Sequence, residues 1–279
     1  MIFQEVKPLP QLQDLVKNYL LVNLKSETDL SATPYATRIE QTLIFFARGY
    51  ILCKNPETGI TSQISKNAVF GQQISRLNFQ AVQQEDFMML MVIFQPGGLH
   101  RLLGVPASEL LETFCDAALF LNQELNSVNN AIANTYNYQK MIDYVDRFLL
   151  AKISSIKLER HRIDRIGNYL MENPDYFSLD YISNQACLSP RQLERKFKER
   201  FGIGPKLYNR ISRFYKAFMY KDKNPETDWM TVALTFGYSD YNHMAKDFKQ
   251  FANVTPNILL EEYAKRPEAF ANRFINPLK

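Results

Sequence analysis

An internal repeat in the C-terminal half of the chain constrains its fold more than any other feature. The first copy, residues 182–205, reads ISNQACLSPRQLERKFKERFGIGP, and the second, residues 232–256, reads VALTFGYSDYNHMAKDFKQFANVTP. Matching residues lie 50 positions apart up to the serines at 189 and 239, and 51 apart from Leu193 onward. One residue is therefore inserted at the start of the last helix of the second copy. A unit repeated in register predicts one supersecondary structure used twice.

Each copy has the residue order of a helix-turn-helix. A small residue stands where two helices cross, a turn residue follows four positions later, and a capping residue opens the second helix. These residues are Ser183, Cys187 and Ser189 in the first copy and Ala233, Gly237 and Ser239 in the second. The second helix then buries an apolar pair at an i, i+4 step, Leu193 with Phe197 or Met244 with Phe248. Gly202 and Asn253 tolerate the left-handed conformation that ends a helix.

The other faces of these second helices carry side chains suited to DNA. Arginine with glutamine or asparagine can form paired hydrogen bonds to guanine and adenine edges in the major groove, and lysine suits phosphates. The candidate base-contacting residues are Arg191, Gln192, Arg195, Tyr241, Asn242 and Lys246, and the candidate phosphate-contacting residues are Lys198, Lys206 and Lys249. We expect Arg191, Gln192 and Asn242 to specify sequence, whereas Arg195, Lys198, Lys246 and Lys249 chiefly supply affinity.

The charge distribution points to the same half of the chain. Residues 1–150 carry 11 basic and 14 acidic side chains, a net charge of −3, whereas residues 151–279 carry 22 and 15, a net charge of +7. A basic half indicates a polyanionic partner. A single helix-turn-helix pattern is common in helical proteins, but two copies in register within the basic half favour DNA binding.

The segments LSPRQLERKFKERFGIGP and GYSDYNHMAKDFKQFANVTP resemble the C-terminal DNA-binding domain of AraC/XylS-type transcription regulators. The second motif of that family reads G-F-x-x-x-S-x-F-x-R-x-F-K-x-x-x-G-x-T-P, and the resemblance covers about residues 162–263. It implies two helix-turn-helix units joined by a long helix, here residues 205–221. The chain departs from the motif at Tyr238, Asn242, Met244, Lys246 and Asn253. Lysine at 246 lacks the planar two-donor geometry of arginine, which affects how the second unit reads bases.

The N-terminal half has a residue pattern typical of short strands. TLIFFARGYILCKNP ends in an Asn-Pro turn, and FMMLMVIFQPGG is an apolar run closed by Pro-Gly-Gly. These features predict a small antiparallel sheet or barrel. Ser108, with apolar residues behind it, predicts the start of a helix after this run. Residues 117–150 lack Gly and Pro and show helical periodicity; they form either the edge of the first core or a helix that pairs with a second subunit.

VIFQPGGLHRLLGVPASEL resembles the segment that closes the β-barrel-like N-terminal domain in one branch of the same regulators. The resemblance implies a small cupin-like barrel, although a strand-to-helix corner also explains the Pro-Gly-Gly. The expected fold is therefore α+β and multidomain, with an N-terminal small β-barrel and flanking helices before an all-α C-terminal domain. The predicted divisions are a sensory domain at 1–120, a helical linker or dimerisation segment at 121–157, the DNA-binding domain at 158–265 and a tail at 266–279.

Several classes of protein are not favoured by the sequence. No apolar run approaches a membrane span, and MIFQEVKPLP lacks the features of a signal peptide, so we expect a cytoplasmic protein with no membrane partner. The three cysteines lie far apart and predict neither a disulfide framework nor a zinc site. Cupin metal sites need two or three histidines with a carboxylate, and the chain has only His100, His161 and His243. We therefore expect no enzyme activity, no metal and no cofactor.

Together these features predict a sequence-specific DNA-binding transcription regulator whose N-terminal domain responds to a small-molecule effector. The expected partners are double-stranded DNA, an effector, a second copy of the chain in a homodimer and, for an activator, RNA polymerase. Two alternatives stay open. One is a constitutive DNA-binding dimer without a ligand, and the other is a cupin-type enzyme or sugar-binding domain fused to a DNA-binding domain.

Overall fold

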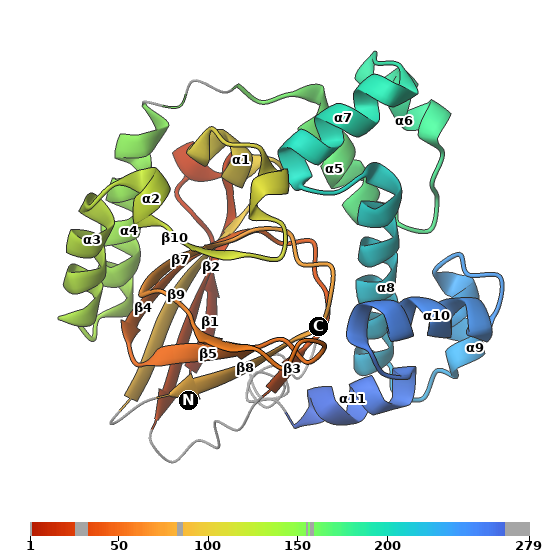
Figure 1. The fold of residues 1–279 in the computed structure, drawn as a ribbon, viewed down its shortest axis with the longest axis horizontal. Helices are drawn as coiled ribbons and strands as arrows, with labels where there is room; N and C mark the ends of the chain where they lie inside the picture. The colour runs from red at the N-terminus through yellow and green to blue at the C-terminus, as the bar shows by residue number, and fades with distance from the viewer. Residues whose placement is uncertain (1, 26–32, 83–85, 155, 157–158, 266–279) are drawn as a thin grey trace.

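The computed structural model describes residues 2–25, 33–82, 86–154, 156 and 159–265. A sheet domain with flanking helices precedes a purely helical C-terminal part, and the two lie against each other (Figure 1). The α+β prediction is confirmed at this level. The tail predicted for residues 266–279 lies outside the described residues.

Two antiparallel sheets form the N-terminal part. The larger has the order β1-β2-β9-β4-β7-β10 and the smaller the order β3-β8-β5-β6. The strands of the larger sheet are Ile2–Val6 (β1), Val16–Lys25 (β2), Asp86–Phe94 (β9), Thr42–Arg48 (β4), Asn67–Phe70 (β7) and Phe114–Asp116 (β10). Those of the smaller are Thr33–Tyr35 (β3), Leu77–Val82 (β8), Tyr50–Lys54 (β5) and Thr61–Gln63 (β6). Within the described ranges the two sheets share no hydrogen-bonded ladder.

The continuous apolar run of β9 follows from its position within the larger sheet. Successive side chains of a strand point to opposite faces. Met88 and Leu90 lie in a core on the outer face, whereas Phe87 and Met89 lie in a second core with residues of the smaller sheet. Because both faces are buried, the strand does not alternate between apolar and polar residues.

Three helices cover the outer face of the larger sheet: Ala118–Leu121 (α2), Glu124–Ala133 (α3) and Tyr138–Ile153 (α4) (Figure 1). Leu125, Ile132 and Val145 are fully buried in the same core as the sheet residues. Residues on both sides of position 120 therefore share one core. The predicted role of residues 121–157 in pairing with a second subunit stays a prediction.

The segment after β9 differs from its prediction. A helix begins at the last residue of Pro-Gly-Gly and spans Gly98–Leu103 (α1), with Gly97 in the left-handed region at φ 78°. The helix predicted from Ser108 is only the short 3-10 turn Ala107–Leu110 (η2). Phe114 then begins a strand, where its ring stacks on that of Phe70 with centroids 3.8 Å apart. Pairing with β7, which makes β10 the edge strand of the larger sheet, thus overrides the local helix signal.

The C-terminal part consists of seven helices in the described residues: Arg162–Glu172 (α5), Leu179–Ala186 (α6), Pro190–Phe201 (α7), Pro205–Lys223 (α8), Trp229–Thr235 (α9), Tyr241–Ala252 (α10) and Pro256–Ala264 (α11). Helix α8 runs from the α5–α7 group to the α9–α11 group (Figure 1). One core continues through both groups, including Phe197, Phe214 and Phe248. Across the described ranges, no helix combines the length and apolar composition needed to cross a membrane.

Candidate nucleic-acid interface

The first repeat forms α6 and α7 with the predicted turn. Cys187 ends α6 in the left-handed region at φ 54°. The Ser189 hydroxyl accepts a hydrogen bond from the Gln192 backbone N–H, and the Ser189 N–H donates to Oε1 of Gln192. This reciprocal capping box fixes the start of α7. Gly202, at φ 84°, ends the helix as predicted.

The second repeat forms α9 and α10 but begins its second helix one residue later than predicted. The N-cap of α10 is Asp240, not Ser239, and the Asp240 carboxylate accepts a 2.7 Å hydrogen bond from the His243 backbone N–H. That bond holds the pKa of the Asp240 carboxyl below its usual range. The inserted residue therefore lies in the turn. Asn253 ends α10 in the left-handed region at φ 57°, as predicted.

The solvent-facing side of α7 carries four of the nine predicted residues. Arg191, Arg195 and Lys198 are exposed, opposite the fully buried Leu193 and Phe197. Lys206, a predicted phosphate-contacting residue, is exposed at the start of α8.

Gln192 is also exposed, but the capping box already uses its side-chain carbonyl oxygen. Paired hydrogen bonds to an adenine need both the oxygen and the nitrogen of the amide. Gln192 must therefore leave the cap before it can read a base in this way, whereas Arg191 is already available.

The matching side of α10 is less basic. Asn242, Lys246 and Lys249 are exposed, and Lys249 Nζ donates to the carbonyl of Asn253 at 3.1 Å. Tyr241 is half-buried, and its ring packs against the helical core. The two helices thus present different chemistry, with arginines on α7 and asparagine and lysines on α10.

A buried carboxylate on α10 holds the second unit to α8. Asp247 is 1% exposed and pairs with Arg210 and Arg213 of α8. The Tyr238 hydroxyl donates to the same carboxylate at 3.1 Å, and burial, with the nearby Asp247 charge, raises the pKa of Tyr238. The repeat pattern does not predict this cluster. The sequence signal was an acidic residue beside Phe248 within the buried stripe of a basic helix.

Two family models match the chain. Residues 182–262 match a model described as a helix-turn-helix domain, and residues 4–116 match a domain of unknown function (DUF6597). Both helix-turn-helix units lie largely within the first match. The second match includes every strand of the two sheets except the first two residues of β1.

One curated relative is similar to part of the chain. The HTH-type transcriptional regulator MtrA of Neisseria gonorrhoeae is 26% identical over 134 residues, which cover 47% of this chain and 44% of MtrA. The chain therefore spans less than half the length of this relative.

The solved structures are more distant. ToxT of Vibrio cholerae with a bound unsaturated fatty acid is 14% identical, covers 87% of this chain and 94% of its own, and has a TM-score of 0.48. The DNA-binding domain of the transcriptional factor AdpA in complex with target DNA is 16% identical, covers 43% of this chain and 100% of its own, and has a TM-score of 0.34.

Proposed function

Since residues 182–262 form a helix-turn-helix domain and resemble AraC/XylS-type regulators, we propose that the protein binds double-stranded DNA in a sequence-specific manner and regulates transcription. The observation that carries this proposal is the pair of capped second helices, α7 and α10, whose outer faces bear exposed Arg191, Arg195, Asn242 and Lys246. We call α7 and α10 the recognition helices.

The geometry suggests how both recognition helices bind one face of DNA. Successive major grooves on one face lie about 34 Å apart. Helix α8 has 19 residues, which at about 1.5 Å per residue gives a length close to 28 Å. Such a helix can hold two units on adjacent turns of the duplex. A homodimer would then contact four half-sites.

Arg191 and Asn242 are proposed to read bases, with Gln192 after release from its cap. Lys198, Lys206 and Lys249 are proposed to contact phosphates. Arg195, Tyr241 and Lys246 lie on or beside the same faces and supply affinity near the bases. Each good paired base contact discriminates by about 1 to 3 kcal/mol.

For the N-terminal domain we propose a cupin-like barrel that senses a small-molecule effector. The apolar core between the two sheets, which includes Phe46, Phe70 and Phe87, supports a barrel-like packing of these strands. Hydrogen bonds join this domain to the recognition helices. An effector that shifts the sheet domain can therefore shift these helices. We further propose a cytoplasmic homodimer without enzyme activity that contacts RNA polymerase if it activates transcription.

Selection from a random double-stranded DNA library tests the central proposal. The full chain should enrich a defined sequence, and its affinity for that sequence should fall steeply as salt rises, since bound phosphates release counterions. Absence of any enriched sequence or of salt-sensitive binding would overturn it. An effector should raise the melting temperature by mass action, whereas a constitutive dimer would show no such shift. A cupin-type enzyme would instead carry bound metal detectable by elemental analysis.

A further inference from the structure

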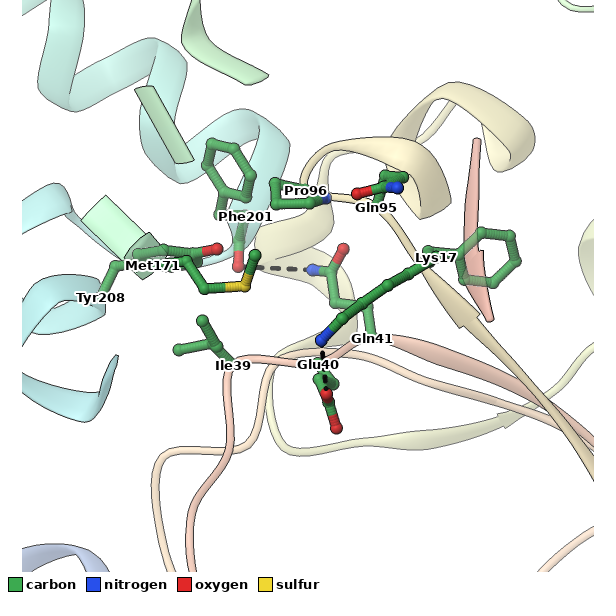
Figure 2. A pocket seen from close by; sticks show the side chains of 10 residues that line it. Lys17, Ile39, Glu40, Gln41, Gln95, Pro96, Met171, Phe201 and Tyr208 are labelled. Carbon is green, nitrogen blue, oxygen red and sulfur yellow. Dashed lines mark hydrogen bonds and ion pairs between the residues drawn. The ribbon is translucent and has the colours of Figure 1, made fainter. Parts of the chain in front are cut away.

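One short segment of the sheet domain contacts the C-terminal ends of both recognition helices. This bridging segment, residues 35–41, runs from the end of β3 to the start of β4. At one end, the backbone N–H and the hydroxyl of Thr37 both donate to the carbonyl of Phe251 in α10, at 3.1 and 2.9 Å. At the other end, Gln41 Nε2 donates to the carbonyl of Phe201, the last residue of α7, at 3.4 Å (Figure 2). Thr37 is fully buried and Gln41 is 5% exposed.

Arg76, the residue before β8, adds a second contact to α10. Its Nη1 donates to the carbonyl of Ala252 at 3.1 Å, and its Nη2 pairs with Glu262 of α11 at 3.0 Å. Ala252 occupies the same place in the second repeat as Phe201 in the first. The last four carbonyls of a helix have no partner within the helix and carry its negative pole. Donors from the sheet domain therefore satisfy equivalent carbonyls in both units.

The bridging segment is itself fixed to the sheet domain. Gln72 Nε2 donates to the carbonyl of Arg38 at 2.6 Å, and the backbone N–H of Phe94 in β9 donates to the carbonyl of Gln41 at 3.1 Å. Gln72 is fully buried. A displacement of β9 or of the loop that contains Gln72 would thus move the segment.

Packing accompanies these hydrogen bonds. Ala36 belongs to the helical core, and Ile39 packs against it. The Arg38 guanidinium lies 5.2 Å from the ring centroid of Tyr215 on α8. The cavity beside Ile39, Gln41 and Phe201 has a volume of about 10 Å³, which is close to the minimum for one water molecule. The contact between the domains is therefore closely packed around the segment.

We propose that Thr37, Gln41 and Arg76 are positioning residues, which fix the two recognition helices relative to each other and so set the spacing between the two DNA half-sites that one chain accepts. This inference rests on the proposed function, because it assigns the sheet domain a role in how the same helices read DNA. Helix α8 supplies one connection between the units, and the bridging segment supplies a second that passes through the sheet domain.

The test is the distribution of half-site spacings that the full chain selects from a duplex library with about 30 random base pairs, enough for two half-sites one helical turn apart. The wild-type chain should select one dominant spacing. In Thr37→Val and Arg76→Met chains, the same two half-site motifs should appear, but sequences with other spacings should become about fivefold more frequent. That is the change expected when one ordinary hydrogen bond is lost from an equilibrium.

Matched controls separate positioning from stability. Thr42→Val, one residue after the segment, removes a buried threonine hydroxyl that has no hydrogen-bond partner among the residues the structure describes. Arg48→Met removes an arginine that pairs with Asp86 and donates to the carbonyl of Ala133, the same kinds of contact as Arg76, but within the N-terminal domain. Both should keep the wild-type spacing, as should Thr37→Ser, which retains the hydroxyl.

The outcomes are distinguishable. An unchanged spacing distribution in folded Thr37→Val and Arg76→Met chains would overturn the inference while leaving DNA binding intact. Equal broadening in the Arg48→Met control would also overturn it. If Arg76→Met fails to fold, Gln41→Met gives the same measurement from the α7 end. A wild-type chain that enriches no sequence would overturn the proposed function, and the inference with it.

Discussion

Arg200 of α7 and Asp164 of α5 form a buried ion pair that joins the first helix-turn-helix unit to the helix before it. Arg200 Nη2 lies 2.7 Å from Asp164 Oδ2, and the two side chains are 6% and 3% exposed. The same carboxylate accepts a hydrogen bond from the His161 backbone N–H and so caps α5. Arg200 thus belongs to the support of the recognition helix and not to its DNA-facing side. The pair also lies against the sheet domain, since a Cβ built on Gly97 would meet Asp164 Oδ1.

Replacing Arg200 alone should destabilise the protein strongly. Arg200→Met leaves the buried Asp164 charge without its partner, and we expect the free energy of unfolding to fall by about 3 to 5 kcal/mol. Urea denaturation measures this loss. In the double variant Arg200→Met, Asp164→Asn, the amide oxygen can still cap α5 and no unpaired charge is buried, so most of the loss should be recovered. A double variant as unstable as the single one would contradict this account.

Arg191 and Lys198 should differ in what their removal does to DNA binding. Arg191→Ala should weaken binding to the selected sequence by about 1 to 3 kcal/mol and change binding to a mismatched sequence much less. Lys198→Ala should weaken both alike and lower the magnitude of the slope of log K against log salt by about 1. Fluorescence anisotropy titrations at several salt concentrations measure both effects. Equal losses on both DNAs for Arg191→Ala would rule out its role in base reading.

Gly237→Ala should destabilise the turn of the second unit. Gly237 has φ 70°, and a Cβ there would lie 2.7 Å from the backbone carbonyl oxygen of Asp175. A Cβ built on Gly104, which has φ 72°, would meet no atom within 4 Å among the described residues. Gly104→Ala therefore isolates the backbone strain, about 1 to 2 kcal/mol, and Gly237→Ala should cost more than this. Comparison of the two melting curves checks the prediction, and equal losses would contradict the steric part.

Stability should fall as the pH is lowered below about 6.5, the ordinary pKa of histidine. His100 is 4% exposed, and burial lowers its pKa, although Nδ1 bonds to the Val105 carbonyl at 2.7 Å. Burial also lowers the pKa of His161, with a further contribution from the nearby Arg200 cation. The unfolded chain therefore binds protons more readily than the folded one, so the free energy of unfolding rises with pH in this window.

Denaturation measured between about pH 5.5 and 7.5 checks this dependence around the ordinary histidine pKa. His100→Gln should reduce the slope of the free energy of unfolding against pH, because one of the two histidines with a lowered pKa is removed. A slope identical to that of the wild-type chain would show that His100 does not contribute.

The helical half could be predicted closely because its signals are local and occur twice. Both left-handed helix ends, Gly202 and Asn253, and the Ser189 cap follow from comparison of the copies. The cap of α10 was assigned one residue too early, because Ser239 and Asp240 are adjacent and both are good capping residues. The repeat alignment predicts the insertion at the start of the last helix, whereas the structure has it in the turn before Tyr241.

The order of the strands and the contact between the domains could not be predicted. Thr37 and Phe251 are 214 residues apart in the chain, and threonine, glutamine and arginine are ordinary in polar loops. Apart from Glu262, which pairs with Arg76, their partners are backbone carbonyls, and every residue type has one. The strand at Phe114 was missed for a related reason, because its stability comes from pairing with β7, far from it in the chain.

The single inserted residue in the second turn decides how the two units can be exchanged. Beyond the turn, Arg191 corresponds to Asn242 and Arg195 to Lys246, so a graft of one reading surface onto the other helix must be aligned at 51 positions. An alignment at 50 would place the donor side chains about 100° around the helix axis, on a neighbouring face. In a chimaera built with the wrong offset, Lys198 would replace the fully buried Phe248, and the second unit would lose stability before its sequence preference could be measured.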